Sequence, residues 1–180
     1  MEGILQEASQ RLFADDTRSV FAVLDGASVP DLRLKLYQHQ PECVCLYAGD
    51  LKPDMAEVAP YLIHLQMDTE FTNWVIESGW GQHWGIFVLG RVEMLEMRKH
   101  FRSFLTVHTS EGKPMLFRYY DPRVMRKYLP TCNREDLAVL FGQVDFYFLE
   151  DEDPRTMLSF HTESGELKQQ RFTLAGAAEK

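Results

Sequence analysis

Short apolar runs alternate with amphipathic segments along the first half of the chain. A run of four to eight apolar residues is typical of a strand that is buried on both faces of a sheet. Apolar residues that recur every three or four positions instead predict a helix with one buried face. The runs predict strands at residues 19–25, 43–49, 59–65 and 84–89, and the periodic segments predict helices at 4–13, 31–39, 69–79 and 92–107.

The predicted helix at 92–107 has the clearest apolar stripe in the chain. Its apolar positions are Met94, Met97, Phe101, Phe104 and Leu105. Start signals mark other helices, because a Thr, Asp or Asn side chain can accept a hydrogen bond from a free N–H of the first helical turn. We expect such caps at Asp68 or Thr69, at Asp121 and at Asn133.

The pattern changes toward the C-terminus. A strand is predicted at 115–120, then helices at 122–128 and 134–142, then strand-like runs at 144–150, 156–163 and 167–174. Ser164-Gly165 is a hairpin turn signal between the last two runs, and residues 175–180 are predicted to be a loose tail. The sequence therefore predicts a mixed α/β fold: a largely alternating β-α sheet domain over 1–142, with a small β-rich extension or small lobe over 143–180.

Composition excludes several classes of protein. With 180 residues and 45% hydrophobic content, the chain can bury a real core, so it is neither a disordered chain nor a disulfide-stapled miniprotein. Three cysteines leave at least one thiol unpaired, which favours a reducing cytoplasm. Neither a secretory signal nor an apolar stretch approaching the ~20 residues of a membrane span is visible. We expect a cytoplasmic protein with no membrane partner.

Charge is distributed unevenly along a chain whose net charge is −8. Residues 1–90 hold 13 acidic and 5 basic groups, residues 91–134 hold 4 and 10, and residues 135–180 hold 10 and 4. The whole chain has no electrostatic reason to bind nucleic acid, although the basic block could steer a partner of complementary charge. The alternative is that Arg98, Lys99 and Arg102 are only the solvated face of a helix.

The common catalytic and cofactor motifs are missing from the sequence. The glycines of Gly79–Gly85 follow a helix and precede a strand, the reverse of a phosphate-binding loop, so we interpret them as a helix stop and turn. Cys43 and Cys45 lie in a predicted buried strand, where a thiol is usually structural. The histidines are scattered singly, and the acidic run 150–153 is typical of a solvated loop. We therefore expect no catalytic residues, no cofactor and no metal.

Phe146-Tyr147-Phe148 places aromatic side chains on both faces of one predicted strand. Either a second layer of the protein covers the outer face, which is the interpretation we favour, or a partner does.

One string of residues resembles a known family. Phe117-Arg-Tyr-Tyr-Asp-Pro-Arg-Val124, followed by Tyr128-Leu-Pro130 and Leu137–Gly142, is similar to the effector adaptor or chaperone domain of bacterial type VI secretion systems, of the Tap or TEC type. Ala22–Ala27, Ala59–Leu62 and Trp84–Ile86 extend the resemblance upstream. It implies a cytoplasmic, non-catalytic protein that binds a toxic effector and helps load it onto the spike (VgrG-type) protein.

The residues of this string have physical roles that can be proposed from their chemistry. Pro122 fixes the backbone as a helix begins, and Asp121 can cap that helix. Arg118 or Arg123 can pair with a carboxylate, either Asp121 or Asp25 within the fold or an acidic group of a partner. The candidate partner-binding residues are Arg118, Tyr120, Asp121, Arg123, Arg126, Lys127, Phe146 and Phe148.

Two other functions remain open at this point. The first is a small α/β hydrolase or nucleotide-binding enzyme whose site is assembled from distant residues, for example Asp25, His64 and Asp121 at strand ends. The second and weaker one is nucleic-acid binding through residues 91–134.

Overall fold

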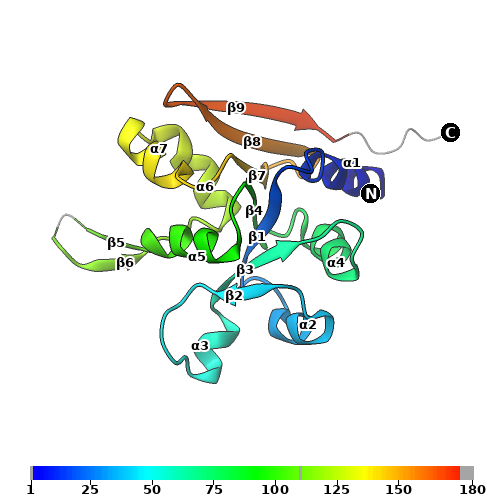
Figure 1. Cartoon of the computed structure of the whole chain (residues 1–180), viewed down its shortest axis with the longest axis horizontal. Helices are drawn as coiled ribbons and strands as arrows, with labels where there is room; N and C mark the ends of the chain where they lie inside the picture. The colour runs from blue at the N-terminus through cyan, green and yellow to red at the C-terminus, as the bar shows by residue number, and fades with distance from the viewer. Residues whose placement is uncertain (1, 110, 175–180) are drawn as a thin grey trace.

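The computed structural model describes residues 2–109 and 111–174, which fold around one seven-stranded sheet (Figure 1). The strands lie in the order β2-β3-β1-β4-β7-β8-β9, and all neighbours in it are antiparallel. Their bounds are β1 Ser19–Asp25, β2 Cys43–Cys45, β3 Pro60–Leu65, β4 Gly85–Gly90, β7 Phe146–Glu150, β8 Thr156–Glu163 and β9 Glu166–Thr173. The mixed α/β fold class is confirmed.

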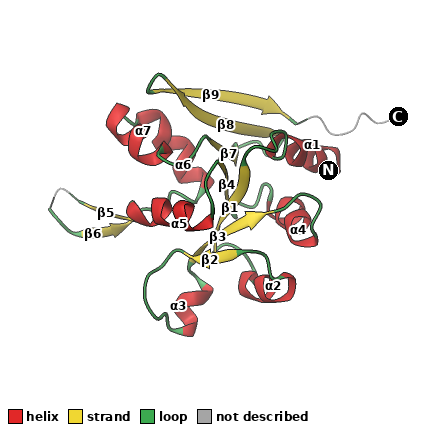
Figure 2. Cartoon of the chain, viewed as in Figure 1, coloured by secondary structure: helices red, strands yellow, loops and turns green. Residues whose placement is uncertain are grey.

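Helices cover both faces of this sheet, which makes three layers (Figure 2). One face is covered by α1 (Glu2–Leu12), α2 (Leu32–His39) and α4 (Glu70–Gly79), and the other by α5 (Met94–Ser103), α6 (Pro122–Tyr128) and α7 (Arg134–Phe141). Within β1, Phe21 and Val23 join the core beneath α5–α7, whereas Ala22 and Leu24 join the core beneath α1, α2 and α4. Because both faces are buried, these antiparallel strands are apolar without alternation.

Local capping chemistry places several helix and turn boundaries where the sequence predicts them. Thr69 Oγ1 accepts a hydrogen bond from the Thr72 N–H at 3.2 Å. Asn133 and Asp136 form a reciprocal capping box at the start of α7. Ser164 and Gly165 both adopt positive φ, of 53° and 80°, in the β8–β9 hairpin turn, where glycine carries no steric cost.

The segment between α5 and α6 differs from the prediction. The helix ends at Ser103, not at 107, and β-branched residues follow in β5 (Thr106–His108). The predicted strand at 115–120 is only β6 (Pro114–Leu116), which pairs with β5 in a separate two-stranded sheet. This small hairpin projects away from the main sheet (Figure 1). Residues 118–121 form a turn, and this turn allows the adjacent side chains of Tyr119 and Tyr120 both to be buried. In a strand, adjacent side chains point to opposite faces of the sheet.

The β2 edge also differs from the prediction. The strand spans three residues, not 43–49, and Cys43 is exposed because it lies at the border of the sheet. A short helix that the sequence pattern did not predict, α3 (Pro53–Glu57), follows it with proline in its first turn and no buried side chain.

The C-terminal strands continue the main sheet. Strand β7 pairs with β4 through backbone hydrogen bonds, with Phe148 opposite Phe87. This pairing favours a C-terminal extension of the sheet over a separate small lobe. The division of the chain into two parts at residue 142 stays a prediction. Tyr147 and Phe148 are buried in the two opposite cores, so the protein covers both faces of β7 itself.

The predicted tail, 175–180, lies outside the described residues. None of the helices in the described ranges has the length and apolar character that crossing a membrane requires.

His100 joins α5 to α7 and makes the stability of this layer depend on pH. Its Nε2–H donates to the Leu140 carbonyl at 2.9 Å, and its ring packs against Phe101 and Phe104. Burial lowers the pKa of His100, although the Leu140 hydrogen bond opposes that shift. The unfolded chain therefore takes up this proton near pH 6.5, and the folded chain does so only at lower pH.

We predict that the free energy of unfolding falls as pH drops below about 6.5, by at most about 1.4 kcal/mol per pH unit for this one proton. His100→Gln removes this contribution and flattens the dependence. Urea unfolding of both proteins between about pH 5 and pH 8 measures it; equal slopes for the two proteins would contradict the assignment.

Candidate functional site

Buried carboxylates gather at one end of the main sheet. Asp25 ends β1 and Glu150 ends β7, and β4 begins between them with Gly85 opposite Leu24. Asp121 lies at the start of α6, and Arg123 interacts electrostatically with all three carboxylates. The exposed fractions of Asp25, Asp121 and Glu150 are 2%, 5% and 4%. Carboxylates this deeply buried need hydrogen-bond donors to stay ionised.

Asp25 is held by the loop that follows β1 and by an arginine far along the chain. Its Oδ1 accepts the Ala27 N–H at 3.1 Å, and its Oδ2 accepts the Ser28 hydroxyl at 2.8 Å. The Nη2 group of Arg118 donates to the same Oδ2. The sequence left Asp121, Asp25 or a carboxylate of a partner open for Arg118, and the structure pairs it with Asp25.

Asp121 caps α6 and pairs with an arginine two residues later. Its Oδ1 accepts the backbone N–H and the Nε–H of Arg123, both at 2.9 Å, and its Oδ2 accepts Nη2 at 2.7 Å. Burial opposes ionisation of Asp121, but the hydrogen bonds from Arg123 outweigh it and hold the pKa of this carboxyl below its ordinary value. The cap and the bidentate pair agree with the roles proposed from the sequence.

The two tyrosines of the motif anchor the turn from inside. The Tyr119 hydroxyl donates to the Phe101 carbonyl at 3.1 Å, and its ring stacks on Phe101 at 5.3 Å. Tyr120 shares a side-chain hydrogen bond with Tyr47, and burial raises the pKa of Tyr120 far above its usual range. The Asp121 N–H closes the turn on the Arg118 carbonyl at 3.1 Å.

The arginines lie on the outside of this anchored turn. The side chains of Arg118 and Arg123 are 44% and 50% exposed, whereas those of their partners Asp25 and Asp121 are 2% and 6% exposed. We call Arg118 and Arg123, each fixed by a buried carboxylate, the arginine pair.

Glu150 has a structural role that the sequence analysis missed. The acidic run 150–153 predicts a solvated loop, yet Glu150 is buried, accepts the Gly81 and His83 N–H groups and contacts His83 Nδ1. It thereby fixes the turn between α4 and β4. Its position at the end of an apolar strand is the signal that could have separated it from Asp151–Asp153.

Other predicted partner-binding residues lie apart from the arginine pair or are less accessible. The Arg126 side chain is 11% exposed and meets Glu152 at 3.4 Å, so it offers little to a partner, whereas Lys127 is exposed. Phe148 is buried in the core. Phe146 lies at the opposite end of β7, where the guanidinium of Arg18 covers its ring.

The structure does not assemble the alternative site of Asp25, His64 and Asp121. Across β1 and β3, His64 faces Phe21 while Asp25 faces Pro60. Four residues separate these positions along the strand, a distance of about 13 Å. The His64 ring instead meets Glu42 at 3.1 Å.

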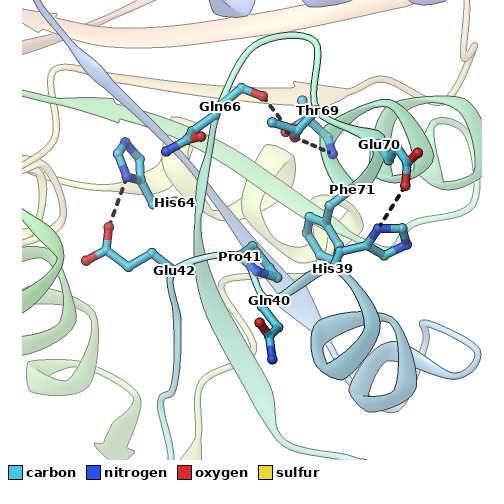
Figure 3. Close-up of a pocket in the computed structure, with 10 residues that line it drawn as sticks. His39, Gln40, Pro41, Glu42, His64, Gln66, Thr69, Glu70 and Phe71 are labelled. Atoms are coloured by element: carbon cyan, nitrogen blue, oxygen red, sulfur yellow. Dashed lines mark hydrogen bonds and ion pairs between the residues drawn. The ribbon is translucent and has the colours of Figure 1, made fainter.

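His64 lines a pocket of about 290 Å³ between β3 and the ends of α2 and α4 (Figure 3). Two separate His–Glu pairs lie across it: His64 with Glu42, and His39 with Glu70 at 3.5 Å. Thr69 is occupied as the cap of α4. A nucleophile with an adjacent base is not formed by these lining residues, and the described part of the chain contains no group of His, Cys, Asp and Glu suited to a metal ion.

We predict that Arg118→Ala lowers the free energy of unfolding by about 2 kcal/mol, because Asp25 then remains buried without its charged donor. The control Arg155→Ala removes an arginine that pairs with an exposed carboxylate, Asp153, and should leave stability unchanged. Urea unfolding measures both variants. Combining Arg118→Ala with Asp25→Asn should cost less than the sum of the single changes; additive losses would mean that the two residues do not interact.

Comparison with known proteins gives one family match that covers most of the chain. Glycine–tRNA ligases of Staphylococcus aureus, strains JH9, Newman and N315 among them, are 33% identical over 108 residues, which is 56% of this chain and 21% of each ligase. The chain thus spans about a fifth of the length of these curated relatives. No solved structure matches it. Residues 20–138, which include β1, the turn of the arginine pair and α6, match the family described as "Domain of unknown function (DUF4123)". The chain belongs to the DUF4123 family.

Proposed function

We propose that this protein is a type VI secretion effector adaptor, which binds a toxic effector in the cytoplasm and helps load it onto the spike protein without catalysing a reaction. The DUF4123 match over residues 20–138 supports the proposal, because it spans the string Phe117–Val124 on which the resemblance to the adaptors depends. The observation that carries it is the arrangement of that string: its tyrosines and aspartate are used inside the fold, and its arginines face outward.

The geometry of the carboxylates favours binding over catalysis. General acid–base chemistry needs a group that can exchange a proton, most often an imidazole or a carboxyl, within reach of a substrate proton. Asp25, Asp121 and Glu150 are instead covered and hydrogen-bonded to their own chain. The charged groups that pair with Asp25 and Asp121 and remain accessible are guanidinium groups, which recognise carboxylates and phosphates but stay protonated.

The β5–β6 hairpin gives further support for a binding role. Met115 and Leu116 on β6 are 53% and 41% exposed. A two-stranded hairpin alone is only marginally stable in water, and exposed apolar side chains on a projecting element are typical of interaction surfaces. This hairpin leads directly into Arg118.

We predict that the chain forms a stoichiometric complex with the product of a neighbouring effector gene, and that this complex also captures the spike protein encoded beside it. Co-expression followed by affinity purification and size-exclusion chromatography with light scattering measures the composition. An unrelated cytoplasmic protein of similar net charge, used as bait, controls for non-specific capture. Absence of any complex with either neighbour would count against the adaptor function, as would turnover of a small substrate by the purified chain alone.

A further inference from the structure

We propose that the arginine pair, Arg118 and Arg123, is a docking site for carboxylates on an acidic polypeptide segment of the partner. This inference rests on the proposed function, because the partner is taken to be the effector or the spike. It names the chemistry that this part of the surface recognises.

The two arginines are held in place before any partner arrives. They flank the turn that Tyr119 and Tyr120 anchor inside the core, and each is fixed by a carboxylate that is almost fully covered. A free arginine loses much side-chain entropy when it binds, and one already held in place loses less. The internal ion pairs therefore stabilise the fold and also prepare the guanidinium groups for an external acceptor.

Each guanidinium keeps donors that its internal partner does not use. Arg123 gives Nε and Nη2 to Asp121, and Arg118 gives Nη2 to Asp25. A guanidinium carries five N–H donors. Within the described residues, Nη1 of either arginine has no hydrogen-bond partner, and about half of each side chain is exposed.

A partner that approaches this surface meets the positive member of each ion pair. Asp25 and Asp121 lie beneath the guanidinium groups and do not face solvent. Lys127, exposed one turn further along α6, adds a positive charge, whereas Arg126 is paired with Glu152. Arginine forks match the planar geometry of carboxylates, so an Asp or Glu side chain of the partner can form a charge-assisted hydrogen bond with each.

The rest of the molecule favours an acidic protein over a nucleic acid. A nucleic acid brings a continuous row of phosphates, which the chain's net charge of −8 opposes outside the basic block. Glu152, whose side chain is 75% exposed near α6, would also repel an extended phosphate backbone. A short acidic segment needs carboxylates only at the two positions that face Arg118 and Arg123.

The test uses variants chosen to disturb the buried carboxylates as little as the loss of a guanidinium allows. Arg118→Lys keeps a positive charge beside Asp25, and Arg123→Gln leaves Asp121 its backbone N–H bond. Arg155→Gln is the matched control, because Arg155 pairs with Asp153 two residues earlier just as Arg123 pairs with Asp121. Circular dichroism and thermal melting confirm that each variant is folded.

The probes are overlapping short peptides that cover the products of the neighbouring genes, which the proposed function takes to be the effector and the spike, with binding measured by fluorescence anisotropy. We expect the bound peptides to be those with clustered Asp and Glu. Affinity should fall about tenfold in Arg123→Gln and further in the double variant with Arg118→Lys, and stay unchanged in Arg155→Gln. Analogues with Asn and Gln in place of Asp and Glu should bind at least tenfold more weakly.

The outcomes separate this inference from the proposed function. If the wild-type chain binds the full-length neighbours but the arginine variants bind them equally well, or if the neutral analogues bind as tightly, the docking site is wrong and the adaptor function stands. If the wild-type chain binds neither neighbour, the adaptor function fails and the inference with it. Binding of single-stranded DNA through the same arginines, with steep salt dependence and without peptide binding, would overturn the choice of an acidic polypeptide.

Discussion

Charged carboxylates beneath the surface constrain the architecture of this protein. An ionised carboxyl without donors is unfavourable by several kcal/mol, so Asp25 and Asp121 can remain buried only if the chain brings donors to them. For Asp25 the charged donor is Arg118, 93 residues later. Strands β2, β3 and β4 and helix α5 all lie between these two residues. The pair therefore joins the end of β1 to a turn that the chain reaches only after these strands and this helix, which couples the surface site to the global fold.

Because the sheet is covered on both faces, the uneven charge of the sequence becomes an uneven charge in space. The basic block, residues 91–134, supplies α5 and α6, which cover one face of the sheet, and the β5–β6 hairpin, which projects away from the sheet. The other face is covered by α1, α2 and α4, all from the acidic first half of the chain. The hairpin, with its exposed Met115 and Leu116, is followed directly by the arginine pair within this basic block.

Local chemistry determined what could be predicted from the sequence. Caps at Thr69, Asp121 and Asn133 and the Ser164-Gly165 turn depend on neighbouring residues, and the structure confirms all of them. Continuous apolar runs located the central strands because those strands are buried on both faces. The prediction was wrong where burial depends on the position of a segment in the tertiary structure. Cys43 was expected in a buried strand, but it is exposed at the edge of the sheet. The segment after β6 was expected to continue as a strand, but it forms a turn that buries both Tyr119 and Tyr120.

The candidate site shows the same division. The bidentate pair of Arg123 with Asp121 is local and was among the expected pairings. The choice of Asp25 for Arg118 required the fold, because Asp25 and Asp121 are similar carboxylates in sequence. The burial of Arg126 and of Glu150 also depends on elements distant in the chain, namely the loop at Glu152 and the turn at Gly81 and His83. A single sequence carries no direct signal for either contact.

The arginine pair also limits what this surface can do chemically. Burial lowers the pKa of Arg118, but its hydrogen bond and ion pair with Asp25 outweigh that effect; for Arg123 the bonds to Asp121 dominate. The pKa of each guanidinium is therefore raised above a value that is already far from neutral. Neither group can give or take a proton during a reaction near pH 7, so neither can act as a general acid or base. Such groups still provide fixed positive charge and directed hydrogen bonds, and these are the interactions by which one polypeptide recognises the carboxylates of another.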